Sequence, residues 1–150
     1  MPNGWRLAIA GSTGGFGAQD ELLAVEQSSR RSDIDILGYV PGERLEELYS
    51  RASVFAFPSL DEGFGMPVLD AMAHGIPVVT SSRSALPDVA GHAAALIDPE
   101  DIEALGEALR TLARNEDLRE DLAQHGRHRA LQFPWQKAIE RTWSVYVELR

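Results

Sequence analysis

The chain has 150 residues, 44% of them hydrophobic and 25% charged, which is the composition of one ordinary globular domain with its own core. It has no cysteine, which excludes disulfides and thiolate metal sites and fits a reducing cytoplasm. Its formal net charge of −9 argues against general binding to nucleic acids or anionic membranes, so any bound phosphate must be held locally against the overall field.

Apolar runs and amphipathic stretches alternate through the first hundred residues. In chain order, the pattern predicts a buried strand (6–11), a glycine-rich turn, a helix (about 19–28), a strand (34–40), a helix that begins at Pro41 (41–52) and a strand (53–59). A turn and a helix that stops at Gly75 follow, then a strand (76–81), a short segment (85–91) and a strand (94–99). This alternation predicts an α/β fold, a Rossmann-like doubly wound and mostly parallel sheet.

The chain is predicted to be helical from residue 101 onward. The segment 101–115 has apolar residues at 102, 105, 108, 109 and 112, with acids at its start, and a second helix is expected over about 117–131. A third begins at Pro134, and we expect its Trp135, Trp143 and Tyr146 to belong to the core. The prediction is one domain over 1–150, with the sheet region at about 6–100 and a helical tail at 101–150.

The segment 61–72, DEGFGMPVLDAM, is the most unusual turn of the chain. Ligands of open parallel sheets bind at the carboxyl ends of strands, where this turn lies. Gly63 and Gly65 allow close backbone approach, and Pro67 suits the first helical position. The free N–H groups of the helix start favour a diphosphate, while Glu62 at the rim could accept hydrogen bonds from sugar hydroxyls. Asp70, one turn into the helix, could reach a second polyol such as ribose.

A purely structural interpretation accounts for the same residues. Acids near helix starts are common because the helix dipole favours them, by roughly 0.3–1 kcal/mol each. Gly-x-Gly before a helix also occurs as simple turn chemistry. Spacing by itself leaves the two interpretations open.

Other polar residues give weaker signals. His125 and His128 could share a helix face, but no third metal ligand is apparent, and His74 is expected to help close its helix before Gly75. The turn 11–17, GSTGGFG, matches neither a dinucleotide fingerprint nor a P-loop and is predicted to be a flexible site wall. Arg83, in the segment after strand 76–81, is the basic residue that could reach an anion.

The block 38–99 closely resembles the donor-site region of group 1 glycosyltransferases, the large retaining family with the GT-B fold. The similarity includes the Gly-Phe-Gly turn inside a motif of two acids separated by seven residues, and it extends from about Arg6 to Val147. The resemblance implies a nucleotide-sugar site in the carboxy-terminal half of a two-domain enzyme. It implies that Glu62 is catalytic, contacting the sugar hydroxyls. The implied donor-binding residues are Gly11, Ser12, Gly38, Tyr39, Val40, Gly63, Phe64, Gly65, Met66 and Asp70.

This chain departs from the family pattern in two ways. Asp70 stands where the family has Glu, and it is one methylene shorter, so its ribose contact is direct or through water. The first βα unit of the domain, with an Arg and a Lys that clamp the diphosphate, has no counterpart, and neither does the amino-terminal acceptor domain. Met1 is therefore expected to be the start of an excised piece. We expect no metal, and we expect the isolated chain to be inactive.

The resemblance implies transfer of a hexose from a nucleotide-sugar donor, GDP-mannose or a UDP-sugar, to an unknown acceptor in polysaccharide or glycolipid synthesis. An epimerase or hydrolase of the same fold, or a non-catalytic Rossmann-like module, remains an alternative. A glycosidase, with two carboxylates flanking the bond, fits poorly. The implied location is cytoplasmic, with a peripheral membrane position left open through the absent domain. Removal of that domain is expected to allow weak self-association through the last helix.

Overall fold

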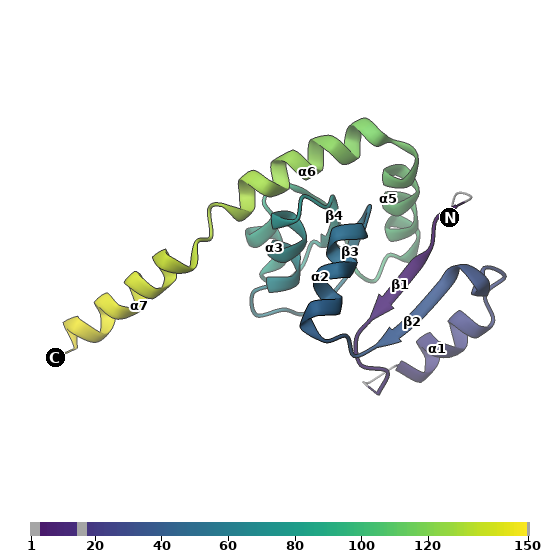
Figure 1. Ribbon diagram of the computed structural model, residues 1–150, viewed down its shortest axis with the longest axis horizontal. Coiled ribbons are helices and arrows are strands. Elements are labelled where there is room, and N and C mark those ends of the chain that lie inside the picture. The colour runs from purple at the N-terminus through teal and green to yellow at the C-terminus, as the bar shows by residue number, and fades with distance from the viewer. Residues whose placement is uncertain (1–3, 15–17, 150) are drawn as a thin grey trace. The chain divides into compact units, whose positions relative to one another are not determined.

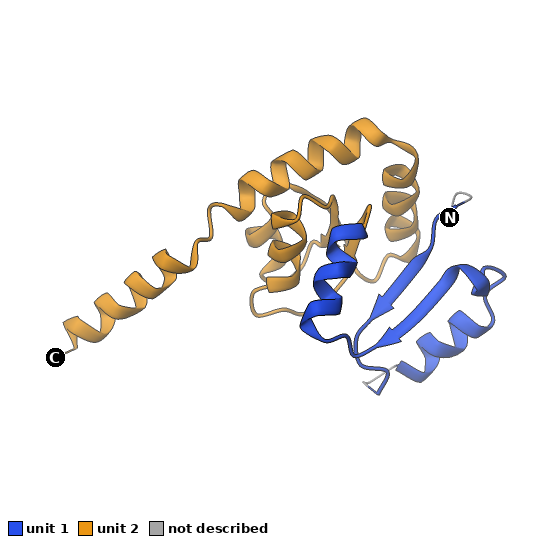
Figure 2. Cartoon of the chain, in the orientation of Figure 1, with its two compact units in different colours: residues 1–51 blue, residues 52–150 orange. Residues whose placement is uncertain are grey.

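A computed structural model describes residues 4–14 and 18–149. The chain forms two compact units, residues 1–51 and 52–150 (Figure 2), and each is described by itself. Met1 and part of the glycine-rich turn, residues 15–17, lie outside the described residues. The single domain over 1–150 therefore stays a prediction.

The first unit contains a two-stranded parallel sheet. Its elements are β1 (Leu7–Ala10), α1 (Ala18–Glu26), a short 3-10 turn (Arg31–Asp33), β2 (Ile34–Gly38) and α2 (Gly42–Arg51). Leu7 pairs with Ile34, and the neighbouring Arg6 guanidinium holds Asp35 through bonds of 2.8 and 3.1 Å. The prediction of a buried first strand is wrong, because Leu7 and Ile9 are 37% and 39% exposed.

The second unit contains a three-stranded parallel sheet in the order β3-β4-β5, and Figure 1 labels β3 and β4. The strands are β3 (Phe55–Phe57), β4 (Val78–Ser81) and β5 (Ala94–Ile97), and Val78 pairs with both Phe55 and Ala94. The helices are α3 (Met66–Ala73), α4 (Leu86–Ala90), α5 (Ile102–Arg114), α6 (Glu116–Ala130) and α7 (Trp135–Glu148). The predicted α/β class with parallel strands and a helical tail is confirmed.

The core of the second unit lies between the sheet and helices α3 to α6. Val79 and Ile97 from the strands pack with Leu112 of α5 and Leu122 of α6. Helix α6 also meets α3, whose residues Val68 and Met72 have no exposed surface. Of the predicted apolar stripe on α5, the first residue does not take part, since Ile102 is 82% exposed.

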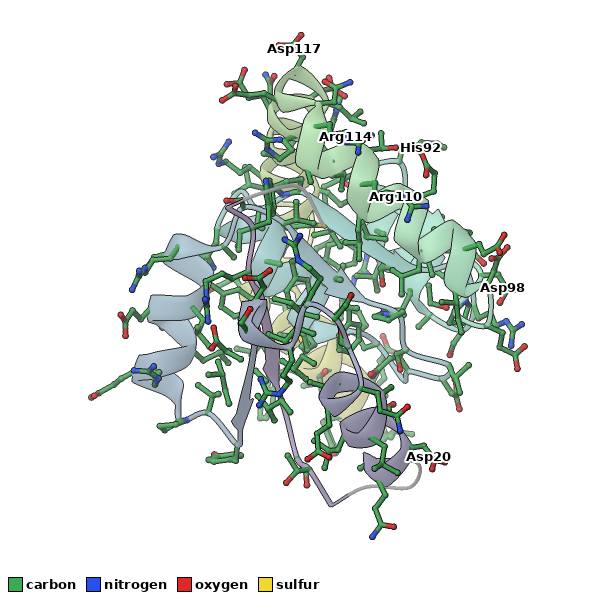
Figure 3. The ribbon with its side chains drawn as sticks, turned by 90° about the vertical axis from the view of Figure 1, so that its right-hand side faces the viewer. Asp20, His92, Asp98, Arg110, Arg114 and Asp117 are labelled. Atoms are coloured by element: carbon green, nitrogen blue, oxygen red, sulfur yellow. The ribbon has the colours of Figure 1, made fainter. Side chains whose placement is uncertain are left out.

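Local signals in the sequence define the helix ends of this unit. Asp101 accepts a hydrogen bond from the Ala104 N–H at 2.9 Å and so caps α5. Arg114, in the last turn, complements the helix dipole, and Figure 3 shows it at the end of α5 away from Asp98, with Arg110 between them. At the end of α3, Gly75 takes a left-handed φ of 70°. The Gly75 N–H bonds to Met72 O and the next N–H to Ala71 O, which is a Schellman motif.

The last helix, α7, does not pack on the rest of the second unit (Figure 1). Its apolar side chains form one stripe, and Trp135, Trp143 and Tyr146 are 70%, 64% and 64% exposed. The prediction that these three residues belong to the core is therefore wrong. The 3.6-residue period correctly identified an apolar face, but a period does not say what covers that face. Within the described residues, no helix is both long enough and apolar enough to cross a membrane.

Candidate functional site

Three turns of the second unit follow the carboxyl ends of its parallel strands. They are residues 58–65 after β3, 82–85 after β4 and 98–101 after β5. Because all three strands run in one direction, their following turns gather at the same edge of the sheet. The predicted residues Glu62 to Met66 lie in the first turn and at the start of α3. Hydrogen bonds join the turn after β4 both to this first turn and to the turn after β5.

The backbone at Gly65 ends the first turn and begins α3. Gly65 is the residue before the helix, with φ 98° and ψ 45°, a conformation that residues with a Cβ rarely adopt. A Cβ at this position would lie 2.5 Å from Leu86 Cδ2, and Leu86 is completely buried. Glycine is therefore required at 65 both for the conformation and for close packing. Gly63 has open space around it.

The local chemistry at the amino-terminus of α3 would favour an anion bound there. No side chain caps it, its first turn holds no acid, and Pro67 brings no N–H. The Val68 N–H bonds back to Gly65 O at 3.0 Å. The positive end of the helix dipole is thus not neutralised by a side chain of the helix's own first turn.

The two acids of the motif lie in different surroundings. Glu62 is partly buried in the turn, whereas Asp70 is exposed in the second half of α3. The carbonyl of Asp70 accepts from the His74 N–H at 3.1 Å and lies 2.8 Å from His74 Nδ1. This geometry agrees with the role predicted for His74, closing the helix end, since its backbone N–H and its ring both contact the Asp70 carbonyl.

Ser84 lies in the turn after β4. It connects that turn to residues 58–65, the turn after β3, which we call the site turn. Its Oγ lies 2.7 Å from both Asp61 Oδ1 and Glu62 O, and it accepts from the Glu62 N–H at 3.2 Å. Ser59 Oγ, at the start of the same turn, donates to Asp61 O at 3.2 Å. Sequence reasoning missed Ser84, because its partners are 22 and 23 positions away along the chain.

Arg83 is already paired within the protein. Its guanidinium lies 2.8 Å from Asp98 and 2.6 Å from Glu100, both in the turn after β5. Hydrogen bonds from the Glu100 N–H and from Arg83 hold the pKa of Asp98 below its ordinary value. The same pairing raises the pKa of Arg83, mainly through the hydrogen bond to Glu100. These contacts argue against the prediction that Arg83 reaches an anionic ligand.

The ring of Phe64 packs against a second aromatic ring. Its ring meets Phe133 edge to face, with centroids 5.9 Å apart, and the Arg129 guanidinium lies 4.8 Å from the Phe133 centroid. Arg129 also donates to the Val89 carbonyl at 2.8 Å. Phe133 stands between α6 and α7, so the junction of the last two helices contacts the site turn. Sequence reasoning did not assign Phe133 this role, and no local signal marks it.

The predicted site residues of the first unit also meet one another. The Gly11 N–H donates to Gly38 O at 2.9 Å, so the turns after β1 and β2 are joined. Gly38 has φ 64°, which glycine adopts without strain. The hydroxyl of Ser12 accepts from the Gly14 N–H at 3.3 Å, and Tyr39 is 86% exposed. Val40 follows Tyr39 and is partly buried.

The histidines do not form a metal centre in the described part of the chain. His125 Nδ1 lies 3.3 Å from Asp121, one turn earlier on α6, and both side chains are exposed. No group of three or more His, Cys, Asp or Glu is arranged to hold a metal ion among residues 4–14 and 18–149.

The chain is similar in sequence and in fold to proteins described as glycosyltransferases. Residues 2–129 match the model of the family described as "Glycosyl transferases group 1". The chain is 39% identical over 132 residues to O-antigen chain mannosyltransferase B of Escherichia coli, covering 87% of this chain and 35% of that protein. It is 32% identical over 149 residues to D-inositol 3-phosphate glycosyltransferase of Corynebacterium jeikeium, covering 95% of this chain and 35% of that protein.

Solved structures agree with the sequence comparisons. Sucrose-phosphate synthase from Thermosynechococcus elongatus superimposes with a TM-score of 0.85 at 26% identity, covering 96% of this chain and 38% of that one. A glycosyltransferase from Rickettsia africae superimposes with a TM-score of 0.84 at 15% identity, which shows the shared fold. The chain spans about a third of the length of the curated relatives that it matches over most of its own length.

Proposed function

The chain belongs to the group 1 glycosyltransferases, and we propose that it is the part of such an enzyme that binds the nucleotide-sugar donor. The single observation that carries the proposal is the geometry between Glu62 and Met66. A left-handed Gly65, packed against Leu86, delivers the chain into a helix start with no capping side chain and no first-turn acid. Such a helix start favours a diphosphate, which needs backbone donors and a positive dipole end.

Glu62 is proposed to contact the hydroxyls of the donor sugar. A carboxylate is a strong acceptor for such hydroxyls, and Glu62 lies three residues before the helix start that is proposed to hold the diphosphate. Asp70 is exposed in the second half of the same helix and is proposed to bind the ribose, directly or through water. The backbone of Phe64 and Met66 and the glycines 63 and 65 are proposed to approach the sugar and diphosphate.

Residues of the first unit are also proposed to bind the donor. The hydrogen bond between Gly11 and Gly38 supports a common role for the turns after β1 and β2. Gly38, Tyr39 and Val40 are proposed to line the nucleobase, largely through backbone groups, and Gly11 with Ser12 to lie beside the phosphates and sugar.

The donor is proposed to carry a hexose on a nucleoside diphosphate. Relatives include a mannosyltransferase of O-antigen chains and an α-(1→4)-mannosyltransferase of Mycolicibacterium hassiacum, which supports mannose as the sugar. GDP-mannose and UDP-sugars both remain candidates, since backbone contacts to a base leave little trace in sequence. The proposed reaction of the full-length protein is transfer with retention, in polysaccharide or glycolipid synthesis, without a metal.

The isolated chain is proposed to be catalytically inactive. The departing nucleotide diphosphate gains negative charge, and stabilising that charge is usually the largest contribution to such catalysis. Arg83, the cation considered for this task, is engaged by Asp98 and Glu100. Orientation of the acceptor, which can supply several kcal/mol, is proposed to come from another domain of the longer protein. The cytoplasmic location expected from the sequence stays a prediction.

The exposed stripe of α7 is proposed to meet that further domain. Trp135, Ile139 and Trp143 lie on this stripe and are each more than half exposed. An apolar face of this kind is a common mark of an interaction surface. When the chain is isolated, weak self-association through the same face is the expected consequence.

Calorimetric titration of the chain with UDP, GDP and ADP, followed by their sugars, tests the proposal. One nucleotide is expected to bind, and its sugar form is expected to bind more tightly. In Glu62→Ala the nucleotide should bind as before while the gain from the sugar is lost. Glu120→Ala removes an exposed carboxylate of α6 and should change neither value. Absence of binding at millimolar nucleotide, or an equal effect of the two substitutions, would refute the proposal.

A further inference from the structure

The segment that follows β4 contacts the site turn at two points. Leu86, the first residue of α4, is completely buried and packs against Gly65. Ser84, two residues earlier, bonds with the other end of the site turn through Asp61 and Glu62. One short segment therefore shapes the turn on both sides of Phe64.

The backbone of Ser84 has a strained, left-handed conformation. Its φ is 58°, and it is the one residue other than glycine with a positive φ among residues 4–14 and 18–149. In this region the Cβ crowds the following carbonyl oxygen, so L-residues other than glycine avoid it. Such conformations persist where the surroundings enforce them, and they are frequent at functional sites.

The neighbours of Ser84 enforce its conformation. On one side, the Ser82 N–H donates to Ile97 O at 2.7 Å and the Arg83 N–H donates to Ser81 Oγ at 3.0 Å. On the other side, the buried Leu86 begins α4. With both flanks fixed, the left-handed residue directs its hydroxyl to the backbone of Glu62.

A glycine could adopt this φ without strain, so the serine must contribute through its hydroxyl. A serine hydroxyl donates one hydrogen bond and can accept two. It accepts from the Glu62 N–H, and it donates to one of two acceptors at 2.7 Å, Asp61 Oδ1 or Glu62 O. The ionised Asp61 is the stronger acceptor of the two. Ser84 thereby ties the residue before Glu62 and the Glu62 peptide group itself to the rigid end of β4.

We propose that Ser84 is a positioning residue that holds the Glu62 backbone so that the Glu62 carboxylate faces the donor sugar. The proposal rests on the function proposed above. Ser84 touches only backbone atoms of Glu62, so its influence on a sugar passes through the direction of the Glu62 side chain. Removing the hydroxyl should therefore weaken the sugar contact while leaving the nucleotide contact unchanged.

A double-mutant cycle on the chain, with GDP and GDP-mannose and with UDP and UDP-glucose as probes, tests this coupling. Ser84→Ala is expected to reduce the gain in affinity that the sugar brings by about three- to tenfold, the range for one lost hydrogen bond. In a Glu62→Ala background the same substitution should cause no further loss. Losses that simply add, or an unchanged gain in Ser84→Ala, would overturn the proposal.

Three further variants separate the hydroxyl from the strain. Ser84→Gly relieves the backbone but lacks the hydroxyl, so it should bind sugar nucleotides as Ser84→Ala does while unfolding at a higher temperature than that variant. Ser84→Thr keeps the hydroxyl but places a β-branched residue at a positive φ, so it should recover part of the sugar gain while unfolding at a lower temperature than Ser84→Ala. Ser82→Ala, an exposed serine of the same turn, is the matched control and should behave as the unsubstituted chain. Normal sugar binding by Ser84→Gly would overturn the proposal.

Amide hydrogen exchange by NMR gives a readout that needs no ligand. The Glu62 N–H should exchange several-fold faster in Ser84→Ala than in Ser82→Ala, because its acceptor has been removed. An unchanged rate would overturn the positioning role whatever the ligand data show. If instead the unsubstituted chain binds none of the four probes, the proposed donor site fails, and the exchange rate alone decides whether Ser84 holds Glu62.

Discussion

Replacing Gly65 with alanine should destabilise the second unit more than any other single methyl group added to the site turn. The added Cβ would lie 2.5 Å from Leu86 Cδ2, and Leu86 has no exposed surface into which it could move. Inserting a methyl group into a packed site costs about 1–3 kcal/mol. The φ of 98° adds about 1–2 kcal/mol for a residue with a Cβ. The expected loss in free energy of unfolding is therefore about 2–5 kcal/mol.

Urea unfolding followed by circular dichroism at 222 nm measures this loss. Tryptophan fluorescence is a poor reporter here, because Trp135 and Trp143 lie on the exposed face of α7. At a urea m-value of about 1.5 kcal/mol/M, the midpoint should fall by more than about 1 M. Gly63→Ala, in the same turn with open space around it, is the control and should shift the midpoint by less than about 0.3 M.

A second variant divides the loss between the clash and the backbone. In a Leu86→Ala background the clash disappears, so adding Gly65→Ala should cost only the backbone part, about 1–2 kcal/mol. Equal midpoints for Gly65→Ala and Gly63→Ala would refute the reasoning. The result also bears on function, because a loss of donor binding in Gly65→Ala could then come from packing alone and would not by itself locate the site.

Three further changes have definite expected outcomes. Asp101→Ala should lower the free energy of unfolding by about 1 kcal/mol in urea titrations, since it removes the cap on the Ala104 N–H; a neutral result would contradict that capping role. Asp98→Asn should reduce stability at pH 7. Because the folded pKa of Asp98 is lowered, the stability it confers is present above the unfolded value and lost as pH falls through the folded pKa. The difference between the two chains should therefore begin to shrink near the ordinary carboxyl value of about 4 and vanish only below the folded pKa; a difference that stays constant on acidification would be the contrary finding. Trp143→Glu should abolish any concentration-dependent association in sedimentation equilibrium, and association that persists would show that another surface is responsible.

The sequence predicts most secondary structure of this chain because its signals are local. Glycine and proline bound the apolar runs, Gly75 ends α3 with a left-handed residue, and Asp101 caps α5. Each of these features acts within about five residues of its own position. The parallel direction of the strands follows from the same alternation of strands and helices.

What the sequence could not supply depends on contacts between distant residues. The stripe of α7 predicts an apolar face, yet Trp143 is 64% exposed because nothing in the second unit covers it. Arg83 is an isolated cation in the sequence, and only the fold brings the turn after β5 to it. The positive φ of Ser84 is invisible in a serine, since glycine or asparagine is the usual sign of such a conformation. The roles of Glu62 and Asp70 toward a donor stay predictions.

The contacts of Phe133 limit how far the carboxy-terminus of this chain can be truncated. The match to the family model ends at residue 129, four positions before the Phe133 ring that Phe64 contacts. A piece trimmed to the matched segment would keep Arg129 but lose both Phe133 and Gln132, to which Arg129 donates. Recognition of a family and completeness of its packing are separate properties, and a piece that keeps these contacts must extend beyond Phe133.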